Sequence, residues 1–126
     1  MGQVVIRIAD LPLLSPAGRG PIPGERLLEG RAFGLGHLTL VLGETPPGQG
    51  TRLHRHDVEE VIIVHAGRGA FTLGETTVEA GAGEVVIIPP GVPHHFVNSA
   101  RSTLYHTDVF ATDTFALEVI EEAESS

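Results

Sequence analysis

The sequence predicts an all-β fold of the barrel or jelly-roll class, in a single domain of 126 residues. Sixteen glycines and nine prolines interrupt the chain at short intervals. Between them lie short runs rich in valine, isoleucine, threonine and phenylalanine, which are residues that favour strands. No stretch has the length and periodicity of a long helix. Many short strands separated by turn residues are typical of a closed sheet or of two packed sheets.

The first 36 residues are expected to precede the barrel. The run VVIRI at residues 4–8 has the composition of a strand, but it has no obvious partner within the chain. We therefore expect it to pair at a sheet edge or with a second subunit, which predicts a homodimer. Residues 11–24 are rich in proline and glycine and are expected to form a loop.

The barrel core is expected to occupy about residues 37–110 and to contain eight strands. Their predicted ranges are residues 37–42, 52–56, 60–65, 69–73, 76–79, 84–88, 94–98 and 103–110. The remaining residues, 111–126, are expected to add one short element and an acidic tail. Phe115, Leu117 and Val119 alternate with Ala116 and Glu118, which predicts a half-buried strand, with a short helix as the alternative.

The composition excludes several classes of function. Eight arginines and no lysine stand against sixteen acidic residues, and a formal net charge of −8 argues against binding nucleic acid. The lack of cysteine removes disulfides, thiolate ligands and a cysteine nucleophile, and the lack of lysine removes a Schiff base. No signal peptide and no apolar run of membrane-spanning length is visible, so we expect a cytoplasmic protein that does not bind membranes.

Two blocks of sequence contain the residue types and spacings of one metal site. The first block, GQGTRLHRHDVEEVIIVHAG, contains His54, His56 and Glu60, and the second, GEVVIIPPGVPHHFVN, contains His94. Because side chains alternate between the faces of a strand, His54 and His56 are expected to point the same way. Imidazole and carboxylate groups are ligands for Fe, Mn, Ni, Cu and Zn. The pattern therefore predicts one divalent transition metal ion per chain.

Three alternatives to this ligand set remain open. Glu59 would replace Glu60 if the turn after His56 were shorter, although the alternation of the strand favours Glu60. His95 is adjacent to His94 and is expected to face the opposite side of its strand. The three histidines could also be buried in a barrel that binds no metal.

The two blocks resemble the two sequence motifs of small single-domain cupins. The first motif is Gly, five residues, His, one residue, His, three or four residues, Glu, six residues and Gly, and the second is Gly, five, Pro, one, Gly, two, His, three and Asn. The matching residues are Gly48, His54, His56, Glu60 and Gly67, then Gly83, Pro89, Gly91, His94 and Asn98. The resemblance covers about half of the chain directly and implies a double-stranded β-helix, which is a conical jelly-roll barrel. It also implies that His54, His56, Glu60 and His94 bind a metal ion inside the barrel.

The resemblance suggests several functions. Small cupins include dioxygenases, oxalate-degrading enzymes, sugar isomerases and binding or sensing domains. Our first expectation is an oxidoreductase of the dioxygenase type, with a small organic substrate and with Glu60 as a ligand and proton acceptor. A non-catalytic module for binding or sensing and a metal-dependent isomerase are the alternatives. An apolar wall is expected around the metal, formed by Ile62, Val64, Phe71, Leu73, Val86, Ile88 and Phe96.

Two further residues are candidates for a catalytic role. His106 and Tyr105 alternate along the predicted strand at 103–110, so one of the two side chains should face the barrel. Either residue could then orient a substrate or move a proton, although exposed positions on an edge strand are favoured for them. His37 and His65 are expected at the surface.

Overall fold

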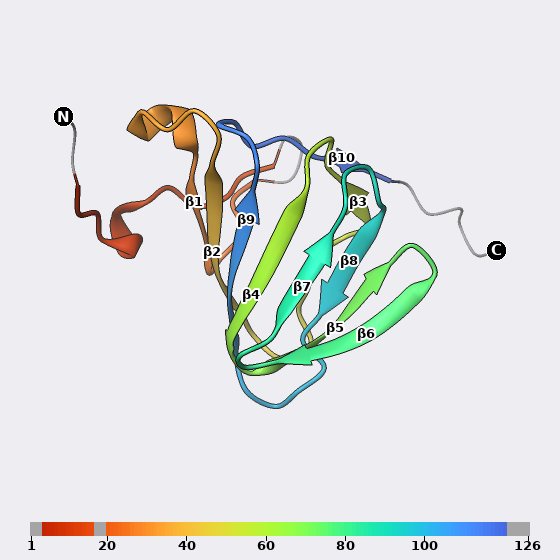
Figure 1. Cartoon of the computed structure of the whole chain (residues 1–126). Coiled ribbons are helices and arrows are strands. Elements are labelled where there is room, and N and C mark those ends of the chain that lie inside the picture. Colours follow the sequence, from red (N-terminus) through yellow and green to blue (C-terminus); the bar gives the residue numbers. More distant parts are fainter. Residues whose placement is uncertain (1–3, 17–19, 121–126) are drawn as a thin grey trace.

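The computed structural model describes residues 4–16 and 20–120, which form two five-stranded antiparallel sheets (Figure 1). The strands are β1 (Glu25–Leu28), β2 (Thr39–Thr45), β3 (His54–Arg55), β4 (Glu60–Ala66), β5 (Arg68–Leu73), β6 (Thr76–Gly81), β7 (Val85–Ile88), β8 (His94–Val97), β9 (Leu104–Phe110) and β10 (Glu118–Val119). The described part of the chain has only two helical segments, the short 3-10 helices η1 (Ile8–Asp10) and η2 (Gly30–Phe33). The predicted all-β jelly-roll class is therefore confirmed.

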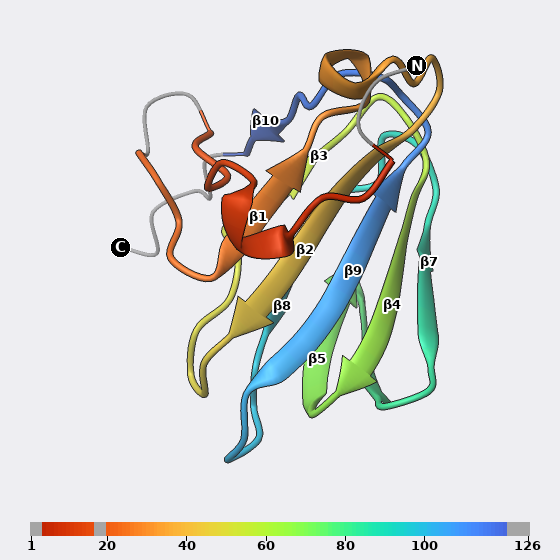
Figure 2. The same ribbon diagram turned by 90° about the vertical axis from the view of Figure 1, so that its left-hand side faces the viewer.

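The order of the strands places the two motif blocks on both sheets. One sheet has the order β1-β2-β9-β4-β7 and is seen face on in Figure 2, and the other has the order β10-β3-β8-β5-β6. β3 and β8 are neighbours in the second sheet, whereas β4 belongs to the first. Side chains that point inward from these three strands consequently meet between the sheets. None of the helices described here is both long and apolar enough to cross a membrane.

All eight strands predicted for the core are present, with shifted ends. The largest shift is in β2, predicted at residues 37–42 and found at Thr39–Thr45, where it pairs along its whole length with β9. Residues 115–120 contain β10 rather than a short helix, and Phe115, Leu117 and Val119 are half-buried while Ala116 and Glu118 are exposed. The strand interpretation of this segment is confirmed.

Two predictions near the N-terminus are wrong. The part of VVIRI before Ile8 is not a strand, Ile8 itself begins η1, and Val4 and Val5 are 80% and 84% exposed. A strand needs a neighbouring strand to pair with its backbone groups, and among the described residues no strand pairs with this segment. A homodimer formed through this segment stays a prediction. The second error is β1, which was not predicted because its sequence, ERLL, begins with a charged residue on the buried face.

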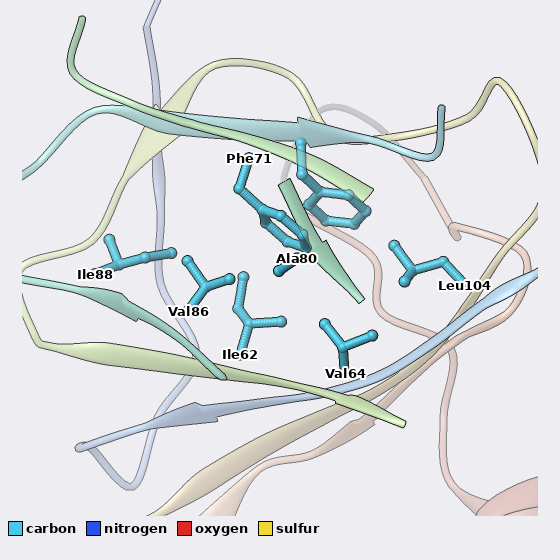
Figure 3. Close-up of a cluster of buried hydrophobic side chains, with 8 residues drawn as sticks. Ile62, Val64, Phe71, Ala80, Val86, Ile88 and Leu104 are labelled. Carbon is cyan, nitrogen blue, oxygen red and sulfur yellow. The ribbon is translucent and has the colours of Figure 1, made fainter. Parts of the chain in front are cut away.

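A cluster of buried apolar side chains fills the space between the sheets at one end of the barrel (Figure 3). It consists of Ile62, Val64, Phe71, Ala80, Val86, Ile88, Phe96 and Leu104. Phe71 is 1% exposed and stacks on Phe96, with 5.4 Å between the ring centroids. This cluster holds the two sheets together and fixes the strands that carry the motif residues.

Replacing Phe71 with alanine is expected to lower the free energy of unfolding by about 3–5 kcal/mol, because the substitution removes a large buried ring and leaves a cavity. Chemical denaturation of the metal-free protein measures this loss. Ile87→Ala is the control, because Ile87 is 69% exposed on β7 and its removal should cost about 0.5 kcal/mol or less. Equal losses for the two variants would contradict the placement of Phe71 in the core.

Candidate metal centre

The structure brings together the four side chains that the motif spacing selected. His54 lies on β3, His56 follows that strand, and Glu60 and His94 are the first residues of β4 and β8. All four are buried, with exposed fractions between 3% and 9%. Each offers one nitrogen or oxygen atom, and these atoms all lie within 4.8 Å of one another. The four residues thus form a compact buried group between the two sheets.

The alternation of side chains along the strands determines which neighbouring residues face away from the buried ligand group. Arg55 points away from the barrel and forms an ion pair with Glu118 of β10 at 3.0 Å. Glu59 is exposed and His95 is only partly buried, whereas their neighbours Glu60 and His94 are buried. The turn at PPGVP is present, with Gly91 at a φ of 76°. The choice of Glu60 and His94 over Glu59 and His95 agrees with these positions.

A backbone carbonyl orients each of the three imidazole rings. The Nδ1–H groups of His54, His56 and His94 donate to the carbonyl oxygens of Arg52, Ala116 and Val92, at 2.6, 2.6 and 2.8 Å. A ring that donates from Nδ1 in its neutral form carries its free lone pair on Nε2. Hydrogen bonds of this kind commonly orient metal-binding histidines. All three Nε2 atoms are thereby made available as ligands.

The buried polar atoms of the group fit a metal ion. His56 Nε2, Glu60 Oε1 and His94 Nε2 are buried and have no hydrogen-bond partner within the described chain. The Glu60 Oε1 atom lies 3.0 Å from His94 Nε2 and 3.5 Å from His56 Nε2. Atoms that bind one ion at about 2.0–2.2 Å lie at most about 4.4 Å apart, so small side-chain rotations suffice to bring all four atoms into range. A buried group of three histidines and one glutamate that could bind a metal ion is the central feature of the barrel.

The electrostatics of the group favour neutral imidazoles at His54 and His56. Burial lowers the pKa of His54 to about 4 and also lowers the pKa of His56. Burial raises the pKa of Glu60 to about 7, against the opposite effect of nearby His94. Burial opposes protonation of His94, but the Glu60 carboxylate and the Val92 carbonyl outweigh it and raise the pKa of His94. In the metal-free protein, Glu60 and His94 are therefore the pair that holds a proton.

A cavity of about 280 Å³ opens onto these four residues. Only Ile62 and Phe96 of the predicted apolar wall line it, because the other predicted residues pack into or against the core at the closed end of the barrel. Most of the apolar wall comes instead from the two ends of the chain. These residues are Leu14, Pro16, Pro21, Ile22 and Pro23 from the N-terminal side, and Phe115, Leu117 and Val119 from the C-terminal side.

The predicted catalytic candidates His106 and Tyr105 lie on opposite faces of β9. Tyr105 is 43% exposed on the outer face, in agreement with the favoured exposed position, and it is not among the residues that line the cavity. His106 is 2% exposed and points inward from a central strand, so the favoured exposed edge position was wrong for this residue. Its Nδ1–H donates to Asp108 Oδ1 at 2.7 Å. Asp108 and Glu25 line the cavity, and the sequence did not single out either of them.

Two other expectations concern residues outside the cavity. His37 and His65 are exposed, as predicted. Asn98, the final residue of the second motif, is 1% exposed and donates to the carbonyls of Thr45 and Ser102 at 2.9 and 2.8 Å. The side-chain oxygen of Asn98 accepts a hydrogen bond from the backbone N–H of Ala100. Asn98 thus fixes the end of β8 against its neighbouring loops.

The fold and the buried ligand group define a β-barrel protein with a candidate metal centre. The family model described as "Cupin domain" matches residues 41–110, which is more than half of the chain. The chain therefore belongs to the cupin family. The match begins in β2 and ends with β9, so it includes all four residues of the candidate metal centre.

Comparisons with individual proteins agree with this assignment. A curated relative, an uncharacterized protein of Methanocaldococcus jannaschii, is 39% identical over 54 residues, which are 42% of this chain and 43% of the relative. The match thus spans less than half of the relative's length. A double-stranded β-helix protein from Klebsiella pneumoniae has a TM-score of 0.73 at 20% identity and covers 96% of this chain and 100% of its own. A variant of Bacillus subtilis oxalate decarboxylase has a TM-score of 0.77 at 18% identity, over 91% of this chain and 31% of its own.

Proposed function

We propose that the protein is a metal-dependent oxidoreductase of the dioxygenase type that acts on a small organic substrate. The observation that carries the proposal is the position of the candidate metal centre on the wall of an otherwise largely apolar cavity. Four protein ligands leave one or two positions free on Fe(II), Mn(II), Ni(II) or Cu(II). When bound, such an ion supplies Lewis acidity and one-electron redox chemistry next to the cavity.

The residues of the chain would position a substrate and exclude water. The cavity volume lies near the lower end of the range for small-molecule sites, about 300–1,000 Å³, which favours a compact substrate. Phe110 lies against His56, with 4.8 Å between ring centroids, and Phe115 packs edge-on against Phe110. These aromatic rings would cover an apolar or aromatic substrate and keep water away from the metal ligands. Arg52 is exposed and lines the same cavity.

The burial of Glu60 supports a role for this residue in proton transfer as well as in metal binding. Its carboxylate is nearly fully buried, and burial raises its pKa to about 7. This pKa describes the metal-free site, where Glu60 can hold a proton at neutral pH; next to a bound metal, the same carboxylate would lie within reach of a proton from an enol or hydroxyl group. A substrate whose enolate oxygens chelate the metal would place such a proton close to Glu60. Diketones, flavonols and catechols have this chemistry.

Oxygen consumption tests the proposal. Protein loaded anaerobically with Fe(II), Mn(II), Ni(II) or Cu(II) should consume dioxygen with at least one diketone, flavonol, catechol or thiol. His94→Ala should abolish the consumption, whereas His95→Ala, an adjacent residue outside the ligand group, should retain it. No oxygen uptake with any combination of metal and substrate would contradict the oxidoreductase. Tight substrate binding without turnover would then favour a non-catalytic binding module.

A further inference from the structure

A buried chain of hydrogen bonds lies beside the candidate metal centre, and two of its members, Asp108 and Glu25, line the cavity. His106 donates from Nδ1 to Asp108 Oδ1 at 2.7 Å and from Nε2 to Thr45 Oγ1 at 3.0 Å. Thr45 in turn donates to Glu25 Oε1 at 3.0 Å. We call these four residues the His106 network. All four are buried, with exposed fractions of 2–8%, and two of them are acidic.

A glycine makes this network possible. In the register of the sheet, Glu25 pairs with Gly43, and Gly43 pairs with His106. A Cβ atom at Gly43 would collide with Glu25 Oε2 and with the imidazole of His106. The missing side chain therefore lets Glu25 reach across β2 to His106 on β9.

The charges of the network are fixed by its geometry. Burial opposes protonation of His106, but Asp108 and Glu25 on its two sides raise its pKa to about 10. The imidazolium thus donates from both ring nitrogens over the physiological pH range. Two carboxylates with one imidazolium leave the network with an excess negative charge.

Asp108 and Glu25 both line the cavity, but the unpartnered Oε2 atom of Glu25 is fully buried, which leaves Asp108 as the member with an accessible acceptor. Its Oδ1 atom is used by His106, while its Oδ2 atom has no hydrogen-bond partner in the described residues. The side chain keeps 11% exposure, and the residue lines the metal-site cavity. In the register of β4 and β9, Phe110 lies opposite Glu60 and Asp108 lies opposite Ile62. Ile62 is the next inward-facing residue of β4 after Glu60, so Asp108 lies one inward position away from the level of Glu60. A carboxylate oxygen is therefore presented to the cavity beside the candidate metal ligands.

We propose that Asp108 determines which substrates the cavity accepts, by accepting a hydrogen bond from a hydroxyl or ammonium group of a metal-chelating molecule. This inference rests on the proposed function, because it assumes that the substrate occupies this cavity. A fixed carboxylate in an apolar cavity favours donors and repels a second carboxylate, whose burial there would lack compensation. His106 and Glu25 act as positioning residues that hold the Asp108 side chain in place. The predicted substrate class is a small chelator with an additional donor group and no carboxylate near it.

Calorimetric binding of matched catechols to the Ni(II)-loaded protein, under strictly anaerobic conditions, tests this assignment, because four protein ligands leave positions free on Ni(II) and no oxygenation occurs without dioxygen. Pyrogallol and 3-(aminomethyl)catechol add a hydroxyl and an ammonium donor to the chelating oxygens. The methoxy group of 3-methoxycatechol cannot donate, and 2,3-dihydroxybenzoate adds a carboxylate. At least one donor probe should bind the wild type about tenfold more tightly than 3-methoxycatechol. The carboxylate probe should bind most weakly, and the comparison of the two donor probes separates hydroxyl from ammonium recognition.

Substitutions assign the preference to Asp108. Asp108→Asn should reduce the donor preference to within about twofold and improve binding of 2,3-dihydroxybenzoate, while catechol itself binds as before. Glu25→Gln should weaken the same preference partially, since it loosens the support behind His106. Glu44→Gln is the matched control, because Glu44 is exposed on the outer face of β2, and it should leave every affinity unchanged.

Two outcomes would overturn the role of Asp108. One is a wild type that binds pyrogallol, 3-(aminomethyl)catechol and 3-methoxycatechol equally well, and the other is a folded Asp108→Asn protein that keeps the wild-type preference. Absence of binding by all the probes would also overturn it, because the cavity would then not be a substrate site. The protein could prefer probes with a hydrogen-bond donor, through Asp108, and still consume no oxygen with any substrate. That result would support the role of Asp108 and contradict the proposed dioxygenase activity.

Discussion

Replacing either His54 or His94 with alanine is expected to abolish stoichiometric metal binding. The two residues pair directly across β3 and β8, and their rings lie 4.3 Å apart. Each substitution removes one of the four ligand atoms and leaves a gap that water can enter. Loss of a residue that only supports a metal ligand costs about 10- to 100-fold in affinity, so loss of a ligand itself should cost more. Elemental analysis after dialysis against a weak chelator measures the effect.

Neighbouring residues supply the controls for this experiment. His95→Ala removes an imidazole one position away, and Glu59→Gln removes a carboxylate next to Glu60, but neither residue belongs to the buried group. Both controls should retain one metal ion per chain. Equal metal content in wild type, His54→Ala and His94→Ala would show that the ligand set is wrong.

Metal affinity is expected to fall about tenfold for each pH unit below about pH 7. Burial raises the pKa of Glu60 to about 7, and the Glu60 carboxylate helps to raise that of His94, so this pair holds a proton in the metal-free site. The metal must displace that proton, and affinity therefore decreases as the pH falls through this range. Burial lowers the pKa of His54 to about 4, so His54 adds a second competing proton only near that pH. Above pH 7 the affinity should level off.

Competition with a chromophoric chelator for Zn(II), between pH 8 and pH 5, measures this dependence. In Glu60→Gln the carboxylate no longer raises the pKa of His94, so the affinity should be lower overall but nearly independent of pH. A wild-type affinity that stays constant from pH 8 to pH 5.5 would contradict a proton shared by Glu60 and His94.

Three of the four ligand residues could be predicted from the sequence because their geometry is local, whereas His94, on β8, was assigned through the second block and its resemblance to the second cupin motif. His54, His56 and Glu60 lie within seven residues, and the alternation of a strand decides which of their neighbours face inward. The β-rich composition and the regular turns likewise predicted the barrel core. These features depend on short-range stereochemistry, which the order of residues expresses directly.

The cavity wall could not be predicted because it depends on contacts between distant segments. Leu14 and Ile22 belong to an irregular loop, and they pack near Val41 and Phe110 in a second apolar cluster with Phe115. No periodicity marks the inner side of such a loop. The predicted wall was chosen from the inward faces of strands, most of which form the core instead.

The His106 network was missed for a different reason. Glu25 is an acidic residue on the inner face of β1, a position where hydrophobic patterning predicts an apolar side chain. The sequence does contain one signal, Gly43 within an apolar strand, since glycine in a strand interior often marks a close approach of another group. That signal becomes informative only when the register places Gly43 between Glu25 and His106.

The most direct test of the candidate metal centre is anomalous X-ray scattering from crystals of the protein loaded with one metal, measured on both sides of its absorption edge. We expect a single strong anomalous peak per chain, within about 2.0–2.2 Å of His54 Nε2, His56 Nε2, His94 Nε2 and a carboxylate oxygen of Glu60. A metal peak elsewhere in the molecule, or no peak among these four side chains in a fully loaded protein, would contradict the proposed metal centre.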